Sequence, residues 1–288
     1  MSTKTARKTI DPKGAIGGDL RPAVGIGADI YHELRSALER MAKQTKREMI
    51  AALTKSGFDG PKYGQDGADG SYQAKVRINA LSKKWESIFG KLGQKLADRL
   101  VRRTLRHSAV TLGMSLRQIS KDFEVNTRFI DARLKQVINA STQEAASLIK
   151  LIPSQYLGDV QGAVMRSITS GHGLKDLVPT LNRLYDGRLK HARMVALDQT
   201  RKANMNINAA RLQKLGCETF QWVHSGGGAH PRKDHIALSG KEFRFDDPPV
   251  IGVMYGEEVR GLPAQMPNCR CIAKPVFNFE KDDAAEIR

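Results

Sequence analysis

The residues best suited to chemistry gather in two segments near the C-terminal end of the sequence. The first reads WVHSGGGAHPRKDHIALSGKEF and the second reads MPNCRC. Together they supply three histidines, one aspartate and two cysteines, namely His224, His230, Asp234, His235, Cys269 and Cys271. Imidazole and thiolate are the groups that bind zinc in tetrahedral sites. The pattern therefore predicts a zinc site of His235, Cys269 and Cys271, with His230 or His224 as the fourth ligand.

The same residues have two other interpretations. In the first, Arg232, His235 and Asn268 form hydrogen bonds with the loops, and the cysteines pack as small apolar side chains. The Cys-x-Cys spacing favours this interpretation, because the cysteines of structural zinc pairs are usually separated by two to four residues. In the second, Asp234, His235 and Asn268 follow the order of an HNH-type metal nuclease, whose final metal-binding histidine is not evident here. All three interpretations stay open at the level of sequence.

The charge of the chain points to a polyanionic partner. Its 288 residues hold 47 Lys and Arg against 30 Asp and Glu, which gives a net charge of +17. Residues 1–150 carry 28 basic and 15 acidic side chains, so most of the positive charge lies in the first half. Such a balance favours polyanionic partners such as nucleic acid. Charged residues interrupt every apolar stretch before the roughly 20 residues that a membrane-spanning helix needs, so no membrane partner is expected.

A basic stripe follows one face of a predicted helix in this first half. Its six members are separated by steps of one, three or four residues, which places them along one side of a helix. They are Lys91, Lys95, Arg99, Arg102, Arg103 and Arg106. A solvated helix face is the plain interpretation. The alternative is a contact surface for DNA phosphates or for an acidic protein surface, and the scarcity of aromatic residues argues against base stacking.

Hydrophobic periodicity predicts a mainly α protein with a small C-terminal α+β module and long helices in the first half. Residues 1–25 lack periodicity and are expected to be a flexible basic arm. A basic helical region should follow over 26–150, with helices over 29–54, around 85–100 and from Val125 to Leu148, and a Gly-rich loop over 56–73.

Pro153 is interpreted as a break that begins a second region, 151–288. This region should hold helices within 153–215, at 160–170, 174–185 and 188–215, the last closed by Gly216. An α+β module over 216–280 should contain strands 219–223 and 241–245.

Familiar catalytic and nucleotide-binding motifs are absent from the sequence. There is no GxxxxGK[ST], GxGxxG or GxSxG pattern, and Gly226-Gly227-Gly228 lacks the strand-to-helix context of a phosphate loop. A sequence-specific DNA-binding regulator is disfavoured because no clear helix-turn-helix or aromatic platform is visible. The N-terminal residues have no apolar core of a secretory signal, which predicts synthesis in the cytosol. The three cysteines do not suggest a disulfide framework.

The run from Leu148 to the end resembles the phage head-morphogenesis family, the minor head proteins of tailed phages. The similar segments begin LIKLIPSQYLGDVQGAVMRS, ARMVALDQTRKANMNINAARLQKLG and FQWVHSGGGAHPRKDHIALSGKEF, and the last is PNCRC. The family pattern falls here on Arg232, His235, Gly240, Asp247, Pro248, Pro249, Asn268, Cys269, Arg270 and Cys271. The acidic residue common before the arginine is missing from GGGAHPR, which puts a catalytic carboxylate at that place in doubt.

The resemblance implies a structural role rather than an enzymatic one. A family member would be a minor capsid protein in or near the portal vertex of the head, acting in procapsid assembly or in DNA packaging and ejection. Its partners would be the portal protein, capsid or scaffold proteins and the packaged DNA, and it would reside in host cytoplasm during assembly and in the virion afterwards. The alternative function, from another class, is a metal-dependent nuclease or processing enzyme that uses His235 and the Cys-x-Cys.

Overall fold

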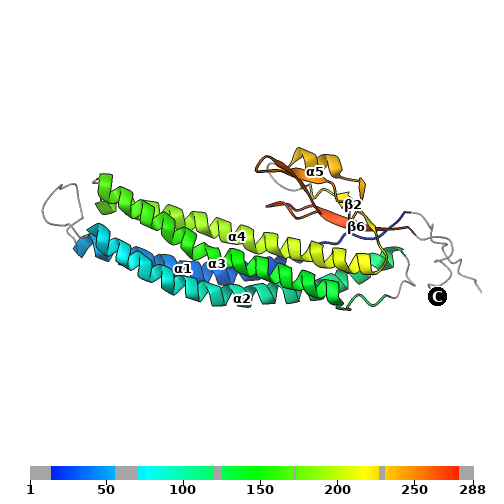
Figure 1. Ribbon diagram of the computed structural model, residues 1–288, viewed down its shortest axis with the longest axis horizontal. Helices are drawn as coiled ribbons and strands as arrows, with labels where there is room; N and C mark the ends of the chain where they lie inside the picture. The colour runs from blue at the N-terminus through cyan, green and yellow to red at the C-terminus, as the bar shows by residue number, and fades with distance from the viewer. Residues whose placement is uncertain (1–13, 56–69, 120–124, 171–172, 227–230, 279–288) are drawn as a thin grey trace, which may run out of the picture. The chain divides into compact units, whose positions relative to one another are not determined.

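A computed structural model describes residues 14–55, 70–119, 125–170, 173–226 and 231–278 of the chain. Four long helices dominate it: α1 (Val24–Lys55), α2 (Gly70–Ile119), α3 (Ala132–Ser170) and α4 (Gly173–Lys214) (Figure 1). The remaining elements are short: β1 (Ala15–Ile16), β2 (Thr219–Val223), α5 (Lys233–Leu238), β3 (Glu242–Arg244), β4 (Val250–Met254), β5 (Glu257–Arg260) and β6 (Ile272–Phe277). The predicted fold class is confirmed. Within the described residues, none of the helices combines the length and the apolar character needed to cross a membrane.

The chain forms two compact units that interleave along the sequence. The sheet unit comprises Met1–Val24, Val101–Ser141 and Thr200–Arg288, and the helical unit comprises Gly25–Leu100 and Thr142–Gln199. These units differ from the domains predicted from the sequence, because α2, α3 and α4 each contribute residues to both.

The helical unit is built from segments of α1 to α4 that pack through apolar faces. Buried residues recur at helical spacing on each segment, for example Leu34 and Leu38 on α1 and Trp85 and Phe89 on α2. Polar pairs fix the register: Glu48 of α1 contacts Arg77 of α2, and Glu33 of α1 contacts Arg99 of α2. The residue numbers of the paired side chains rise along α2 as they fall along α1, so these two helices are antiparallel.

Pro153 does not break the chain, because it lies inside α3. An interior proline loses one helical hydrogen bond and costs about 3 kcal/mol. Buried side chains on both sides of it, Ile149 and Ile152 before and Tyr156 and Leu157 after, anchor the helix across this position. The predicted break at Pro153 is therefore wrong, since the packing of one continuous apolar face outweighs the local cost.

The sheet unit contains a four-stranded antiparallel sheet and a separate hairpin. The strand order is β1-β6-β2-β3, and β4 pairs with β5. Phe220 and Trp222, the inward residues of β2, are fully buried in a core shared with Leu112 and Leu116 of α2 and Leu212 of α4. The sheet is thus held against the ends of two long helices that belong to the same unit.

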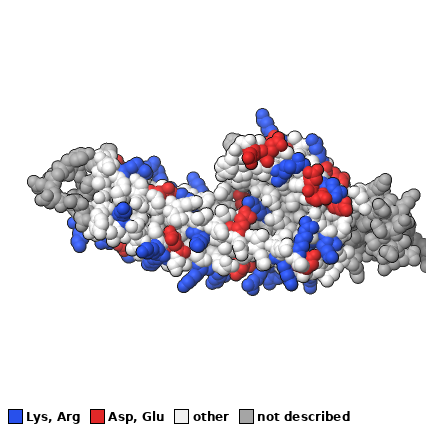
Figure 2. Space-filling model, viewed as in Figure 1, with Lys and Arg blue, Asp and Glu red and all other residues white. Residues whose placement is uncertain are grey.

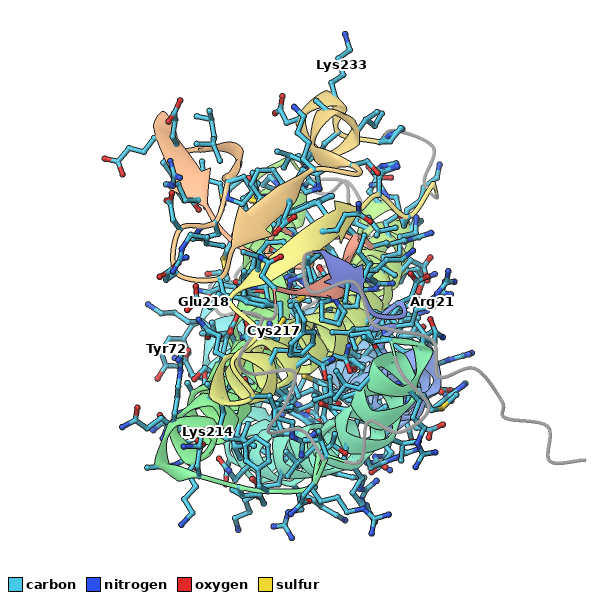
Figure 3. The ribbon with its side chains drawn as sticks, turned by 90° about the vertical axis from the view of Figure 1, so that its right-hand side faces the viewer. Arg21, Tyr72, Lys214, Cys217, Glu218 and Lys233 are labelled. Atoms are coloured by element: carbon cyan, nitrogen blue, oxygen red, sulfur yellow. The ribbon has the colours of Figure 1, made fainter. Side chains whose placement is uncertain are left out.

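The turn from α4 into β2 is set by glycine. Gly216 has a φ of +79°, its N–H donates to the Gln213 carbonyl, and the Cys217 N–H donates to the Leu212 carbonyl. This pair of bonds is a Schellman cap, which favours glycine at the left-handed position. The prediction for Gly216 is confirmed, as is strand 219–223. Figure 3 shows Lys214, Cys217 and Glu218 at this junction.

Several predicted boundaries are wrong within the described residues. Residues 14–25 of the arm expected to be flexible are ordered, since Ala15 and Ile16 pair with β6 and Leu20 is buried. Residues 70–73 of the expected loop belong to α2, and the helix expected from Val125 begins at Ala132, where the Asp131 carboxylate caps the Leu134 N–H at 2.8 Å. The helices expected at 174–185 and 188–215 are one helix, α4. The rest of the arm, loop residues 56–69 and residues 171–172 lie outside the described residues.

Candidate functional site

The sheet unit brings His235, Cys269 and Cys271 together. His235 lies on the short helix α5, and the cysteines lie just before β6. The His235 Nδ1 atom is 3.5 Å from the Cys269 Sγ atom and 3.6 Å from the Cys271 Sγ atom. The three side chains are 3%, 4% and 4% exposed, and their ligand atoms all lie within 4.8 Å of one another. The donors that the sequence placed 34 residues apart therefore form one buried cluster.

Two neighbours fix the orientation of the His235 ring. The Nε2 atom lies 2.9 Å from the backbone carbonyl oxygen of Ile251 on β4. A carbonyl only accepts, so Nε2 carries the proton, and the Nδ1 lone pair faces the two sulfur atoms. The Trp222 ring of β2 packs edge-on against the imidazole, with ring centroids 5.3 Å apart.

The pKa values of the two cysteine thiols are shifted in opposite directions. The pKa of Cys269 is lowered mainly because the Cys271 thiol donates a hydrogen bond to it, and burial opposes that shift. Backbone hydrogen bonds from Cys271 and Ala264 act in the same direction as the Cys271 thiol. The pKa of Cys271 is raised by the same pairing with Cys269 and by burial. The hydrogen bond between the two sulfur atoms therefore makes the first deprotonation of the pair easier than that of an isolated buried cysteine, and the second harder.

The motif residues around this cluster close the loops that carry it. Arg232, directly before α5, donates from Nη2 to the Pro267 carbonyl at 3.0 Å. Gly240, after α5, has a φ of +81°, and its N–H donates to the Trp222 carbonyl at 2.8 Å. These bonds connect the two ends of the α5 segment to the cysteine loop and to β2.

The aspartate-proline turn is held in a similar way by a residue of the hairpin. Arg260 of β5 donates from Nη2 to the Asp247 carboxylate at 2.7 Å and from Nε to the Pro248 carbonyl at 3.0 Å. The carbonyl of Pro249 accepts from the Gly261 N–H at 3.0 Å. Asn268 adopts a left-handed φ of +59° beside Cys269, and the Arg270 side chain is exposed between the two buried cysteines.

His224 does not join the cluster as predicted. His224 is half-buried, and its Nδ1 atom accepts from the Gly226 N–H at 3.2 Å rather than facing the sulfur atoms. Asp234 is exposed on α5, next to Lys233, which points away from the module in Figure 3. His230 lies outside the described residues.

The structure places the basic stripe on one continuous helix, α2, with uneven exposure. Lys91, Lys95, Arg102 and Arg106 are exposed, and Arg99 and Arg103 are half-buried. Arg99 forms an ion pair with Glu33, so part of its charge is already compensated. Figure 2 shows Lys and Arg side chains along the lower edge of the view, where α2 and the first part of α3 lie in Figure 1.

Sequence reasoning missed a buried polar stripe on α4. Its members are Arg201, Asn204, Asn208 and Arg211, all at most 9% exposed. Asn204 donates from Nδ2 to the Leu20 carbonyl at 3.2 Å, and Asn208 accepts a 2.6 Å bond from the Ser108 hydroxyl. Steps of three, four and three residues put these side chains on one helix face. Polar side chains at the spacing of a core face are the signal that would have identified them.

Comparison with known proteins identifies the segment that contains these features. Residues 158–274 match the model of the family described as Phage Mu protein F like protein. This segment is Mu F-like. The resemblance to phage head-morphogenesis proteins is thereby confirmed for that part of the chain. The Mu F-like segment includes all of α4, the hairpin, α5 and all three donors of the buried cluster.

A relative of the chain occurs in Haemophilus influenzae and is described there as an uncharacterized protein. It is 32% identical over 145 residues, which cover 50% of this chain and 30% of the relative. The chain therefore matches less than a third of the length of that relative. No solved structure matches the chain.

Proposed function

We propose that this chain is a minor head protein of a tailed phage that acts at the portal vertex, in procapsid assembly or in DNA packaging and ejection. The observation that carries the proposal is the Mu F-like segment, whose family points to phage head morphogenesis. On this proposal the portal protein, capsid or scaffold proteins and packaged DNA are the partners, and the virion is the final location.

The charge distribution supports contact with DNA inside a head. The net charge is +17, and four exposed cations of the basic stripe follow one face of α2. A chain held beside densely packed DNA gains from positive charge, because each phosphate contact releases condensed counterions. Such contacts need no base recognition, which agrees with the shortage of aromatic residues along the stripe.

The geometry around His235 favours a structural use of the motif residues. Arg232, Gly240 and Arg260 each connect loops of the sheet unit through backbone carbonyl or carboxylate contacts. His235 is itself 3% exposed and bound to the Ile251 carbonyl. Residues engaged in this way hold a fold together, so we propose that the chain is not an enzyme.

Analysis of purified particles tests the proposed role. Heads isolated from a lysate of the phage that encodes the chain should contain it in a few copies, detected by quantitative mass spectrometry. Deleting its gene should leave heads that are malformed or lack DNA in electron micrographs, and expression in trans should restore filled heads. Normal filled heads from the deletion strain, or particles without the chain, would contradict the proposal.

The nuclease alternative has its own test. Purified protein should leave plasmid DNA intact in the presence of Mg²⁺, Mn²⁺ or Zn²⁺. Cleavage that disappears in the variant His235→Ala but persists in the variant His224→Ala would instead establish the enzymatic alternative.

A further inference from the structure

We propose that His235, Cys269 and Cys271 form a zinc site that fastens the loops of the sheet unit. The inference is independent of any role in a phage head, because it rests on the arrangement of three side chains. His235 comes from α5, and the two cysteines come from the segment that leads into β6.

The distances in the cluster are those of a tetrahedral metal site. Typical bond lengths are about 2.3 Å for Zn–S and about 2.0–2.1 Å for Zn–N, so a tetrahedral angle separates the nitrogen and sulfur ligands by about 3.6 Å. The observed Nδ1 to Sγ distances are 3.5 Å for Cys269 and 3.6 Å for Cys271. Both sulfur atoms approach the single lone pair of Nδ1. One lone pair accepts one good hydrogen bond, whereas a metal ion takes all three donors at once.

The Cys-x-Cys spacing fits this geometry because burial alternates along the segment that leads into β6. Alternate residues of an extended segment project to the same side. Cys269 and Cys271 are buried and Arg270 between them is exposed. The left-handed Asn268 and the bond from the Cys269 N–H to the Met266 carbonyl, 3.0 Å long, turn the chain immediately before this segment. Both sulfur atoms therefore converge without the longer spacing of a usual zinc knuckle.

The surroundings of His235 match those of a metal-bound histidine. Metal-ligating imidazoles usually donate their second N–H to a carboxylate or a backbone carbonyl, which fixes the tautomer and the ring orientation. Here Nε2 donates to the Ile251 carbonyl at 2.9 Å, and Nδ1 is left to bind. The Trp222 ring packs against the imidazole and restricts its rotation.

The donor set selects Zn²⁺ on chemical grounds. Thiolate and imidazole are the ligands that zinc favours over the oxygen ligands of Mg²⁺ or Ca²⁺. Two thiolates and a neutral imidazole cancel the charge of one Zn²⁺, so the occupied site carries no net charge into the protein interior. The described residues supply three donors, which is the number of protein ligands in zinc sites that keep a fourth position for water.

The site would stabilise the elements that most need an anchor. The helix α5 has six residues and no side-chain cap at its N-terminus, so it is too short to be stable alone. A metal bond from His235 to the cysteines would tie α5 to the start of β6, and the Ile251 contact extends the connection to β4.

Metal analysis of the full chain tests the proposal directly. Protein purified without chelators from zinc-supplemented cells should contain about one Zn²⁺ per chain. Replacing the metal with Co²⁺ should give the visible absorption of a tetrahedral thiolate-bound ion, and chelation should lower the melting temperature by several degrees. A metal-free wild-type chain that also fails to bind Co²⁺ would overturn the proposal.

Variants separate metal binding from general packing. Cys269→Ser, Cys271→Ser and His235→Ala should each reduce the bound zinc at least tenfold. Cys217→Ala is the matched control, because Cys217 is a buried cysteine of the same core whose thiol contacts the Thr219 and Val276 carbonyls instead. That variant should keep the full zinc content.

A conservative variant guards against misfolding. His235→Cys should retain bound Co²⁺ and shift its absorption toward that of a three-thiolate site, which a purely structural histidine would not do. Full zinc content in Cys269→Ser and Cys271→Ser, or equal loss in Cys217→Ala, would refute the assignment of the ligands.

Discussion

Arg211 shows how a single side chain can shape the interior of the sheet unit. It is 1% exposed, and its Nη1 atom donates to the Ser108 hydroxyl at 2.8 Å and to the Leu105 carbonyl at 3.1 Å. Both acceptors are neutral, so they do not replace the hydration that the cation loses. Burial accordingly lowers the pKa of Arg211 to about 10. The guanidinium orders its neighbours at a cost in free energy.

We therefore expect the variant Arg211→Met to keep or to raise the free energy of unfolding, by about 0–2 kcal/mol, because it removes a buried charge at similar volume. Ser108→Ala should lower the free energy of unfolding by about 1–3 kcal/mol, because the Arg211 Nη1–H and the Asn208 Oδ1 atom both lose the Ser108 hydroxyl as a partner. Urea denaturation measures both. A larger loss in Arg211→Met than in Ser108→Ala would contradict this account.

Cys217 gives a second prediction at the residue scale. Burial raises the pKa of its thiol to about 12, and the thiol donates to the Val276 and Thr219 carbonyls at 3.3 Å. The unfolded chain loses this proton near the ordinary value of 9.0, so the contribution of Cys217 to stability is complete below pH 9 and falls as the pH rises toward 12. At pH 8 iodoacetamide should label Cys217 slowly in native protein and rapidly in urea, as followed by mass spectrometry. Rapid labelling of the native chain would show that the thiol is accessible.

At the scale of elements, sequence periodicity predicts a helix or strand correctly where the burial of one face determines the structure of that element. The apolar spacing of α1 and α2, the alternation in β2 and the glycine at 216 were sufficient for correct predictions. The break at Pro153 was predicted wrongly, because the local cost of proline is visible in the sequence and the packing that offsets it is not. Strands β4, β5 and β6 were not predicted. Pairing partners distant in the sequence hold β6, as its contact with Ala15 and Ile16 shows.

The candidate site was predictable in its residue types and not in its geometry. His235, Cys269 and Cys271 were selected from the chemistry of their side chains, and the structure brings them together. The Ile251 carbonyl and the Trp222 ring could not be selected, because a backbone carbonyl has no sequence signature and a tryptophan in a strand is usually core. His224 was assigned to the cluster on proximity in sequence, and its bond with the Gly226 N–H places it elsewhere.

The hairpin that carries Ile251 allows a test of element stability. Tyr255 and Gly256 form its two-residue turn with φ values of +54° and +87°, and the Tyr255 side chain is fully exposed. A turn with two positive φ angles favours Asn-Gly. Tyr255→Asn should therefore raise the free energy of unfolding by about 0.5–1 kcal/mol in a denaturant titration. Tyr255→Phe keeps both the ring and the strained backbone and should have no effect; a gain in that variant would show that the hydroxyl group, and not the turn, limits stability.

At the scale of the whole molecule, the net charge can be counted from the sequence, whereas the division of the chain into two units depends on the fold. The interleaving of the two units, with α2, α3 and α4 shared between them, is a property of tertiary contacts that a helix-by-helix interpretation of the sequence does not contain. The charge asymmetry is a sum over side chains and needs no fold to be counted. What the structure adds is exposure: Arg99 is paired with Glu33, and Lys91, Lys95, Arg102 and Arg106 are exposed on α2.

The exposed members of the basic stripe lead to a prediction for DNA binding. If phosphate contacts dominate, affinity for duplex DNA should fall steeply with salt and depend little on sequence. Replacing Lys91, Lys95, Arg102 and Arg106 by Gln should reduce the slope of log Kobs against log salt by up to about 3–4, because each lost phosphate contact removes about 0.9. Fluorescence anisotropy over a salt series, with two unrelated duplexes, measures both properties.

A charge-matched variant on another helix makes this test specific. Lys175, Arg183, Lys190 and Arg193 are exposed on α4, so their replacement by Gln removes the same number of charges away from the stripe. This control should retain the wild-type slope, since long-range attraction is screened within about 8–10 Å at moderate salt and direct contacts determine counterion release. Equal reductions of the slope in the two variants would show that DNA binding depends on the overall charge rather than on contacts made by the stripe. An affinity that stays constant across the salt series would remove phosphate contact as its basis altogether.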